Sequence, residues 1–279
     1  MKTLVSVLLT CVVATTAAAQ TETPSQPHLI LTIFGGVSTG NDLWSIARQP
    51  VCVLNTTDDN CSPAVDTLGL RRATTSSLIA GAGATYFPGT TVGYTLEVFY
   101  LGLPLDDGCT GVFFNPDPGA DATYGPRNEQ MCLNITAASP STSAIAFFGG
   151  VAFRFAATSS VSPYIRGSIG IVSYPTGTVE LNGTFVQGGN IRARAVIIDE
   201  HPKQIAFSGQ VAAGMTLRLG PGYQFRFEVR DILVPLQRVT GPAELSNQLQ
   251  APSVTKLFQH AALIMGLDVV LEQKRGRRY

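Results

Sequence analysis

QIAFSGQVAAGMTLRLGPGYQFRFEVRDILV, which spans residues 204–234, decides the fold of this chain. Apolar residues occupy most odd-numbered positions from 205 to 229, whereas polar and charged residues occupy many of the even-numbered ones. The Gly220-Pro221-Gly222 segment separates the two halves. Strict alternation over two runs of about ten residues, joined by a tight turn, predicts a β-hairpin. One face of this hairpin is apolar, and the other is polar and charged.

Alternation of the same kind recurs along the chain and predicts eight strands. We expect them at residues 28–40, 75–87, 91–103, 142–155, 162–174, 204–220, 223–234 and 257–271. Long connections at 41–72, 104–140, 175–203 and 235–252 alternate with short turns. Bacterial outer-membrane barrels have an even number of strands, short periplasmic turns and longer outer loops. The rhythm therefore predicts an all-β fold: an eight-stranded antiparallel up-and-down transmembrane β-barrel over residues 28–272, with long extracellular loops and short periplasmic turns.

The ends of the chain predict export. A positive start at Lys2, an apolar run over 4–13 and small residues at 17–19 are typical of a signal peptide. We expect a signal peptide at 1–19, a periplasmic lead-in at 20–27 and a basic periplasmic tail at 273–279. Beyond the signal, no run of 18 apolar residues could form a spanning helix. An exported, apolar chain of this kind can enter the outer membrane as a closed barrel, which satisfies its own backbone polar groups.

The polarity of the barrel decides between a membrane protein and a soluble lipocalin-like binding protein, which would be apolar inside. Lysine is nearly absent from the predicted strands, although the sheets of soluble proteins carry it on edges and outer faces. The apolar faces are also too large for an eight-stranded interior. An arginine facing lipid at the membrane centre costs about 2–4 kcal/mol, so the charged face must line the lumen and pair there. The expected lumen charges are Glu97, Arg154, Arg166, Arg218, Arg226, Glu228, Arg230 and Asp268.

Glycine and tyrosine add two expectations. Glycines share the charged face of several strands, and we expect them to make room for arginine side chains or to relieve curvature. Tyrosines lie mostly near strand ends, as an interfacial aromatic belt requires. These tyrosines are Tyr86, Tyr94, Tyr100, Tyr164, Tyr174 and Tyr223.

Four cysteines remain after the predicted signal: Cys52, Cys61, Cys109 and Cys132. An even number of cysteines in an exported chain predicts disulfides. Three connectivities are open, and proximity in sequence favours Cys52–Cys61 and Cys109–Cys132. Neither pair has the spacing of a zinc site. We therefore expect two disulfide-tied surface loops, and neither a metal nor another cofactor.

The strand QFRFEVRD at 224–231, the glycine-rich opening strand and the hairpin rhythm resemble the OmpA/OmpX-type outer-membrane β-barrel family. The resemblance covers residues 28–271. It implies a small barrel with a charge-paired core, here Arg226, Glu228 and Arg230 with Glu97 as a partner. Members of the family commonly end on a terminal aromatic residue, whereas a polar, basic segment precedes Tyr279 in this chain.

Function is less well defined by the sequence than the fold. The three histidines are scattered and form no Ser-His pair of the kind found in lipid-modifying barrels, so we expect no enzyme. A formal net charge of zero gives no footprint for nucleic acid. The leading hypothesis is a monomeric, non-catalytic barrel with a plugged lumen, embedded in outer-membrane lipid. Its structural or surface-interaction role, toward an external ligand or partner, would lie in the loops. The alternatives are a porin-like transport barrel for a hydrophobic or small solute, a lipid-modifying enzyme and a soluble lipocalin-like protein.

Overall fold

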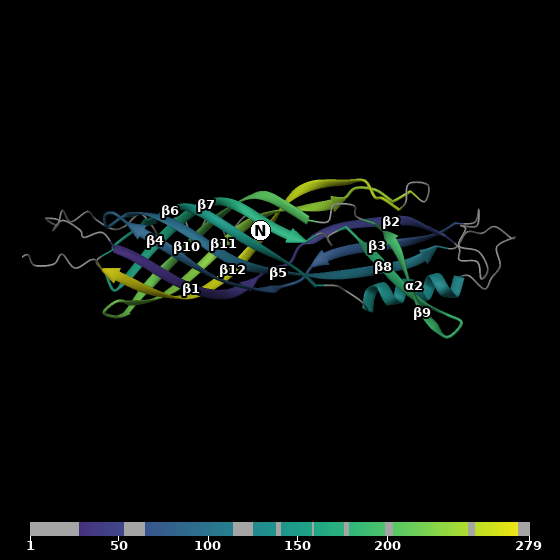
Figure 1. Cartoon of the computed structure of the whole chain (residues 1–279), viewed down its shortest axis with the longest axis horizontal. Coiled ribbons are helices and arrows are strands. Elements are labelled where there is room, and N and C mark those ends of the chain that lie inside the picture. The colour runs from purple at the N-terminus through teal and green to yellow at the C-terminus, as the bar shows by residue number, and fades with distance from the viewer. Residues whose placement is uncertain are drawn as a thin grey trace, which may run out of the picture.

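A computed structural model describes residues 28–52, 65–113, 125–137, 141–157, 159–175, 179–198, 203–244 and 249–272. Its elements are β1 (His28–Ser38), β2 (Asp42–Cys52), β3 (Val65–Thr74), β4 (Ser77–Phe87), β5 (Val92–Phe113), α2 (Gly125–Ala137), β6 (Ser141–Arg154), β7 (Val161–Pro175), β8 (Leu181–Gln187), β9 (Asn190–Ile197), β10 (Lys203–Gly220), β11 (Tyr223–Val239) and β12 (Ser253–Glu272). The predicted signal peptide, the lead-in and the basic tail lie outside the described residues. Figure 1 shows an elongated molecule with a barrel in one half and β2, β3, α2, β8 and β9 in the other.

Eight strands close into a ring in the order β5-β4-β1-β12-β11-β10-β7-β6, because β5 also pairs with β6. Every neighbouring pair in the ring is antiparallel. Each of the eight predicted segments overlaps one of these strands over most of its length, so the predicted fold class is confirmed. A closed ring has no unpaired edge, and a sheet that crosses a bilayer needs this property.

The short turns gather at one end of the ring. His28 pairs with both Phe87 and Glu272, and Tyr86 pairs with Tyr94, which brings the start of β1, the end of β12 and the β4–β5 turn together. The β6–β7 and β10–β11 turns close at the same end. We call it the turn end. The four long connections therefore leave the ring at the opposite end, as the alternating loop lengths predict.

The long connections are not the irregular loops that the sequence predicted. The 41–72 connection contains β2 and most of β3, and β3 pairs with the far half of β5. The next connection continues β5 to Phe113 and then forms α2, while the third folds into the β8–β9 hairpin. Strands β11 and β12 also stay paired as far as Val239 and Ser253. We call β2, β3, residues 105–113 of β5, α2, β8 and β9 the extension.

The extension has a buried apolar core, which explains why it is folded. Leucine, isoleucine and valine recur in all of its parts, and the packing of these elements brings their side chains together. The core contains Leu43, Trp44, Leu68, Leu70, Leu105, Met131, Ile135, Leu181, Val196 and Ile197. The Cys109–Cys132 disulfide joins β5 to α2 across a Cα–Cα distance of 5.3 Å, so one of the two favoured pairs is formed. The Cys52–Cys61 pair lies outside the described residues.

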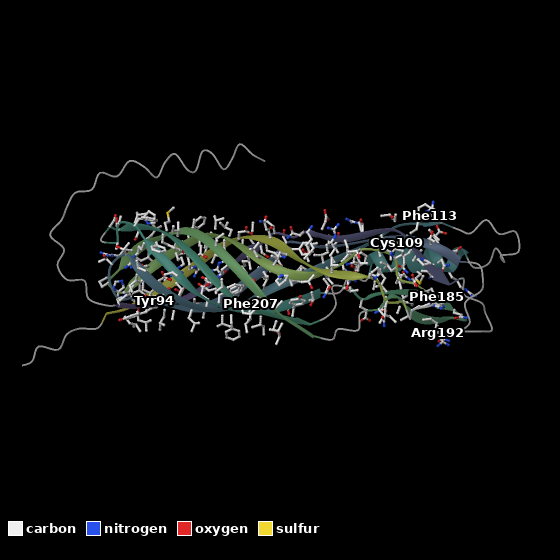
Figure 2. All side chains as sticks on the ribbon, turned by 90° about the horizontal axis from the view of Figure 1, so that it is seen from above. Tyr94, Cys109, Phe113, Phe185, Arg192 and Phe207 are labelled. Atoms are coloured by element: carbon white, nitrogen blue, oxygen red, sulfur yellow. A yellow bond between two sulfur atoms is a disulfide. The ribbon has the colours of Figure 1, made fainter. Side chains whose placement is uncertain are left out.

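Side chains of the ring alternate between an apolar exterior and a largely polar interior. Ile33, Phe207 and Val229 are 73%, 78% and 55% exposed, whereas Arg226 and Arg230 are buried. Figure 2 shows the carbon-rich side chains that surround the barrel, with Phe207 at its outer edge. The predicted polarity is therefore present. Among the helices that the structure describes, none is long and apolar enough to cross a membrane.

Candidate functional site

Four charged side chains form a closed cycle of ion pairs inside the barrel. Arg166 of β7 contacts Glu97 of β5, and it contacts Glu228 of β11 at 2.7 Å. Arg230 of β11 contacts the same two carboxylates, at 3.4 Å and 2.7 Å respectively. In the eight-stranded ring, β5 and β11 lie four strands apart in either direction. The cycle therefore spans the lumen from one wall to the opposite wall.

Two neutral side chains complete the coordination of the carboxylates in this charge cycle. The hydroxyl of Tyr164 donates a 2.6 Å hydrogen bond to Oε2 of Glu228, and Nε2 of Gln210 donates to Oε2 of Glu97 at 3.1 Å. Each glutamate thus contacts two arginines and one neutral donor. All these side chains are buried. Because a buried charge is costly unless it is paired and hydrogen-bonded, this arrangement is what allows ionised groups to fill the lumen.

Further polar layers lie between the charge cycle and the turn end. Arg226 contacts Asp268 through Nε at 3.1 Å, and the hydroxyl of Thr32 donates to Asp268 at 2.7 Å. Closer to the turns, Nη2 of Arg154 lies 2.7 Å from Nε2 of His28. The Arg154 guanidinium also sits 4.2 Å from the centre of the Phe87 ring. Charged groups therefore occupy the interior down to the last residues of the barrel.

On the other side of the charge cycle, the interior becomes aromatic and then aliphatic. The guanidinium of Arg230 lies 4.9 Å from the ring centre of Phe34 and 5.3 Å from that of Phe99. Phe99 stacks on Phe148 with centroids 5.5 Å apart. This layer is continuous with the apolar core of the extension. Beside Tyr164 the lumen retains a cavity of about 20 Å³, which is room for about one water molecule.

Two glycines show what the small residues of the inner face permit. A Cβ atom at Gly83 would lie 2.9 Å from Cγ of Glu97, and one at Gly214 would lie 2.8 Å from the hydroxyl of Tyr164. Both distances are shorter than carbon–carbon or carbon–oxygen contacts allow. We expected the glycines to make room for arginines, but at these two positions they make room for a glutamate and a tyrosine.

Three residues depart from their predicted places. Arg218 is exposed, next to the β10–β11 turn, and joins no ion pair within the described ranges. Its even-numbered position has the same parity as the buried Gln210, but Arg218 lies two residues before the turn and is exposed. Tyr164 and Tyr174 were expected in the aromatic belt but are buried. The belt expectation fits the four exposed tyrosines, which are Tyr86, Tyr94, Tyr100 and Tyr223.

The alternation of β7 predicts that Tyr164 is buried, although its position near a strand end had suggested the aromatic belt. Tyr164, Arg166 and Ser168 occupy alternate positions of β7, so a strand that turns Arg166 inward must turn Tyr164 inward too. Tyr174 follows the same parity, and its hydroxyl donates to the carbonyl of Pro235 at 2.5 Å. Position near a strand end was therefore a weaker guide than the period of the strand.

A second buried ion pair lies in the extension, in a segment that the sequence predicted to be a loop. Nε and Nη2 of Arg72 donate to the two oxygens of Asp107 at 2.5 and 2.8 Å. Arg72 also lies 5.5 Å from the ring centre of Trp44. The alternation of Leu68, Leu70 and Arg72 on the buried side could have revealed this strand. Within the described part of the chain, no three His, Cys, Asp or Glu side chains are grouped as metal ligands.

Comparison with known proteins gives matches in structure alone. No protein-family model matches the sequence, and no curated protein matches it. Among solved structures, the outer membrane protein OprG from Pseudomonas aeruginosa aligns with a TM-score of 0.42 and 10% identity, covering 90% of this chain and 98% of that chain. The outer membrane protein AlkL aligns with a TM-score of 0.38 and 11% identity, over 94% and 98%. Neisserial surface protein A aligns with a TM-score of 0.37 and 10% identity, over 89% and 99%.

The class of the protein follows from its own strand pairings. A closed ring of eight antiparallel strands, apolar outside and charge-paired inside, is the fold that the resemblance to the OmpA/OmpX-type family implies, and this implication is confirmed. The chain is thus an eight-stranded antiparallel barrel by its own strand pairings.

Proposed function

We propose that this chain is a non-catalytic outer-membrane protein whose closed barrel anchors a folded extension at the cell surface. The observation that carries the proposal is the charge cycle, which joins opposite walls of the barrel through Glu97, Arg166, Glu228 and Arg230. A lumen built in this way is a plug. The turn end lies in the periplasm and the extension lies outside the cell, because short turns are periplasmic in this class of barrel.

The apolar exterior supports the membrane location. Large apolar side chains project outward along every strand of the ring. In water so large a patch would drive association, whereas in a bilayer it faces acyl chains. The closed ring also leaves no backbone groups unpaired at an edge. A purified sample that migrates differently on a gel before and after boiling would support a folded membrane barrel, and a fully soluble periplasmic protein would contradict it.

Orientation can be tested with single cysteines in intact cells. Arg192 is exposed on β9 in the extension, and Pro221 is exposed in the β10–β11 turn. A membrane-impermeant maleimide should label R192C in whole cells, and should label P221C only after the outer membrane is broken. The wild-type chain is the control for reaction with native cysteines. Labelling of P221C in intact cells would reverse the proposed orientation.

The plug itself can be tested by conductance in planar bilayers. The folded wild-type protein should show no sustained ion current, because paired buried charges and the aromatic layer fill the lumen. A steady current through the wild-type protein would instead favour the porin-like transport alternative. A current seen only after Glu97 and Glu228 are both replaced by alanine would show that the charge cycle is what closes the barrel.

A further inference from the structure

A cavity of about 350 Å³ lies at the base of the extension, where β2 and β3 approach the end of β11. Its lining includes Asp42, Trp44, Arg71, Arg72 and Arg238. The pairing between β2 and β3 shifts register between Asp42 and Trp44. Such a bulge inserts an extra residue and bends the strand, and both Asp42 and Trp44 line the cavity. The cavity volume falls within the range of small-molecule sites.

The three arginines of this cavity are held in different ways. Arg72 is buried and fixed by its two hydrogen bonds to Asp107. Arg71 makes a single contact with Asp106 at 3.2 Å, between side chains that are 51% and 40% exposed. Arg238 is exposed and makes neither a hydrogen bond nor an ion pair within the described residues. The guanidinium of Arg238 on β11 is therefore free for a ligand, and that of Arg71 on β3 is held only by an exposed contact.

The surrounding charges favour an anion over a cation. Three arginines and one carboxylate, Asp42, line the cavity, and two of the arginines, Arg71 and Arg72, contact aspartates. Asp106 and Asp107 are not part of its lining. The contact between Asp106 and Arg71 is exposed on both sides, so solvent screens it and a ligand displaces it easily. A ligand that offers two or three charged oxygens can replace this contact and also engage Arg238.

We propose that this cavity binds a phosphate monoester, carried by a sugar or by a lipid headgroup. A phosphate monoester has a charge of about −1.5 to −2 and three acceptor oxygens, and the guanidinium fork matches their geometry. Arg71 and Arg238 donate to the phosphate oxygens. Arg72, which is fixed by Asp107 and packs against Trp44, lines the bottom of the site. The remaining volume holds the group that carries the phosphate. This inference rests on the proposed function, because it gives the extension a ligand at the cell surface.

Trp44 supplies a direct signal for the experiment, because it is the only tryptophan of the chain and it lines the cavity. The full-length protein is folded in a zwitterionic detergent, and the emission of Trp44 is followed during titration with glucose 6-phosphate, with glucose as the control. In a second arm the protein is placed in phosphatidylcholine bilayers with or without phosphatidic acid, a lipid phosphate monoester. A saturable, phosphate-dependent change in either arm is the expected result. The arm that responds identifies the source of the phosphate.

Substitutions locate the binding. R238Q and R71Q should each weaken the interaction about tenfold or more, since a hydrogen bond to a charged group contributes roughly that much. R192Q, on the exposed face of β9, is the matched control and should leave the affinity unchanged. No response in either arm, or equal affinity in R238Q and wild type, would overturn the inference. If such a sample still shows the boiling-dependent gel shift and the surface labelling of R192C, the proposed function stands and only the phosphate site is refuted.

Discussion

The barrel and the extension have opposite polarity, and β5 runs through both. In the barrel half of β5, Glu97 points inward and is buried, while Leu96 and Val98 point outward and are exposed. Beyond Phe99 the inward positions become apolar, with Leu101 and Leu105 buried. The inner side of the strand thus changes from polar to apolar, and its strict alternation of buried and exposed residues ends at Leu101. The solvent outside the wall, lipid or water, decides which side of a strand carries its apolar residues.

The comparison also separates two ways of filling an interior. The extension packs aliphatic side chains together, whereas the barrel needs ion pairs because its apolar residues are turned outward. Buried ion pairs contribute little net stability, but the loss of one partner strongly destabilises the folded protein. The barrel interior should therefore be the part of the molecule that is most sensitive to single isosteric substitutions.

The largest effect is expected for E228Q, which removes one of the two carboxylates shared by Arg166 and Arg230. Breaking a buried pair in this way costs about 3–5 kcal/mol. The measurement is the free energy of unfolding in urea for protein folded in micelles. E129Q, an exposed glutamate on α2, is the matched control and should change little. Equal stabilities for the two variants would show that the charge cycle does not stabilise the barrel.

A smaller effect, confined to the extension, is expected when Cys109 and Cys132 are both replaced by serine. The disulfide closes a separation of 23 residues, and the entropy of such a loop corresponds to about 3 kcal/mol. We expect faster proteolysis of the extension, while the boiling-dependent gel shift of the barrel persists. Simultaneous loss of the gel shift would mean that the two regions fold as one unit.

Substitution of two isoleucines of similar exposure tests whether lipid surrounds the barrel and water surrounds the extension. Ile169, midway along β7, is 71% exposed, and Ile191, on β9, is 78% exposed. I169R should cost about 2–4 kcal/mol because it places a charge against lipid. I191R should change stability by less than about 0.5 kcal/mol, as surface substitutions in water usually do. Equal effects would place both side chains in the same solvent and would contradict the membrane assignment.

The sequence predicts the barrel better than the extension for a physical reason. Alternation with a period of two is the direct signature of a wall between two media, so the ring strands and most lumen charges, such as Arg166 and Glu228, could be assigned from it. Alternation alone does not show how far a residue lies from a strand end, and Arg218, two residues before the Gly220-Pro221-Gly222 turn, was assigned from alternation alone. The extension depends on contacts between distant segments, such as Gln49, which hydrogen-bonds both backbone groups of Ala243. No local pattern encodes those contacts.

Among the ion-pair substitutions, the smallest effect is expected for R71Q, and a larger one for the neighbouring Arg72. Both arginines belong to β3, but Arg71 meets Asp106 in water and Arg72 meets Asp107 in the core. An exposed pair contributes up to about 1 kcal/mol, so R71Q should lower the free energy of unfolding by no more than that. The same variant should still weaken phosphate binding, because the proposed site uses the guanidinium of Arg71 and not its partner. If R71Q lowered the free energy of unfolding as much as R72Q does, Arg71 would be a structural residue like Arg72. The proposed division between a ligand-binding Arg71 and a structural Arg72 would then be wrong.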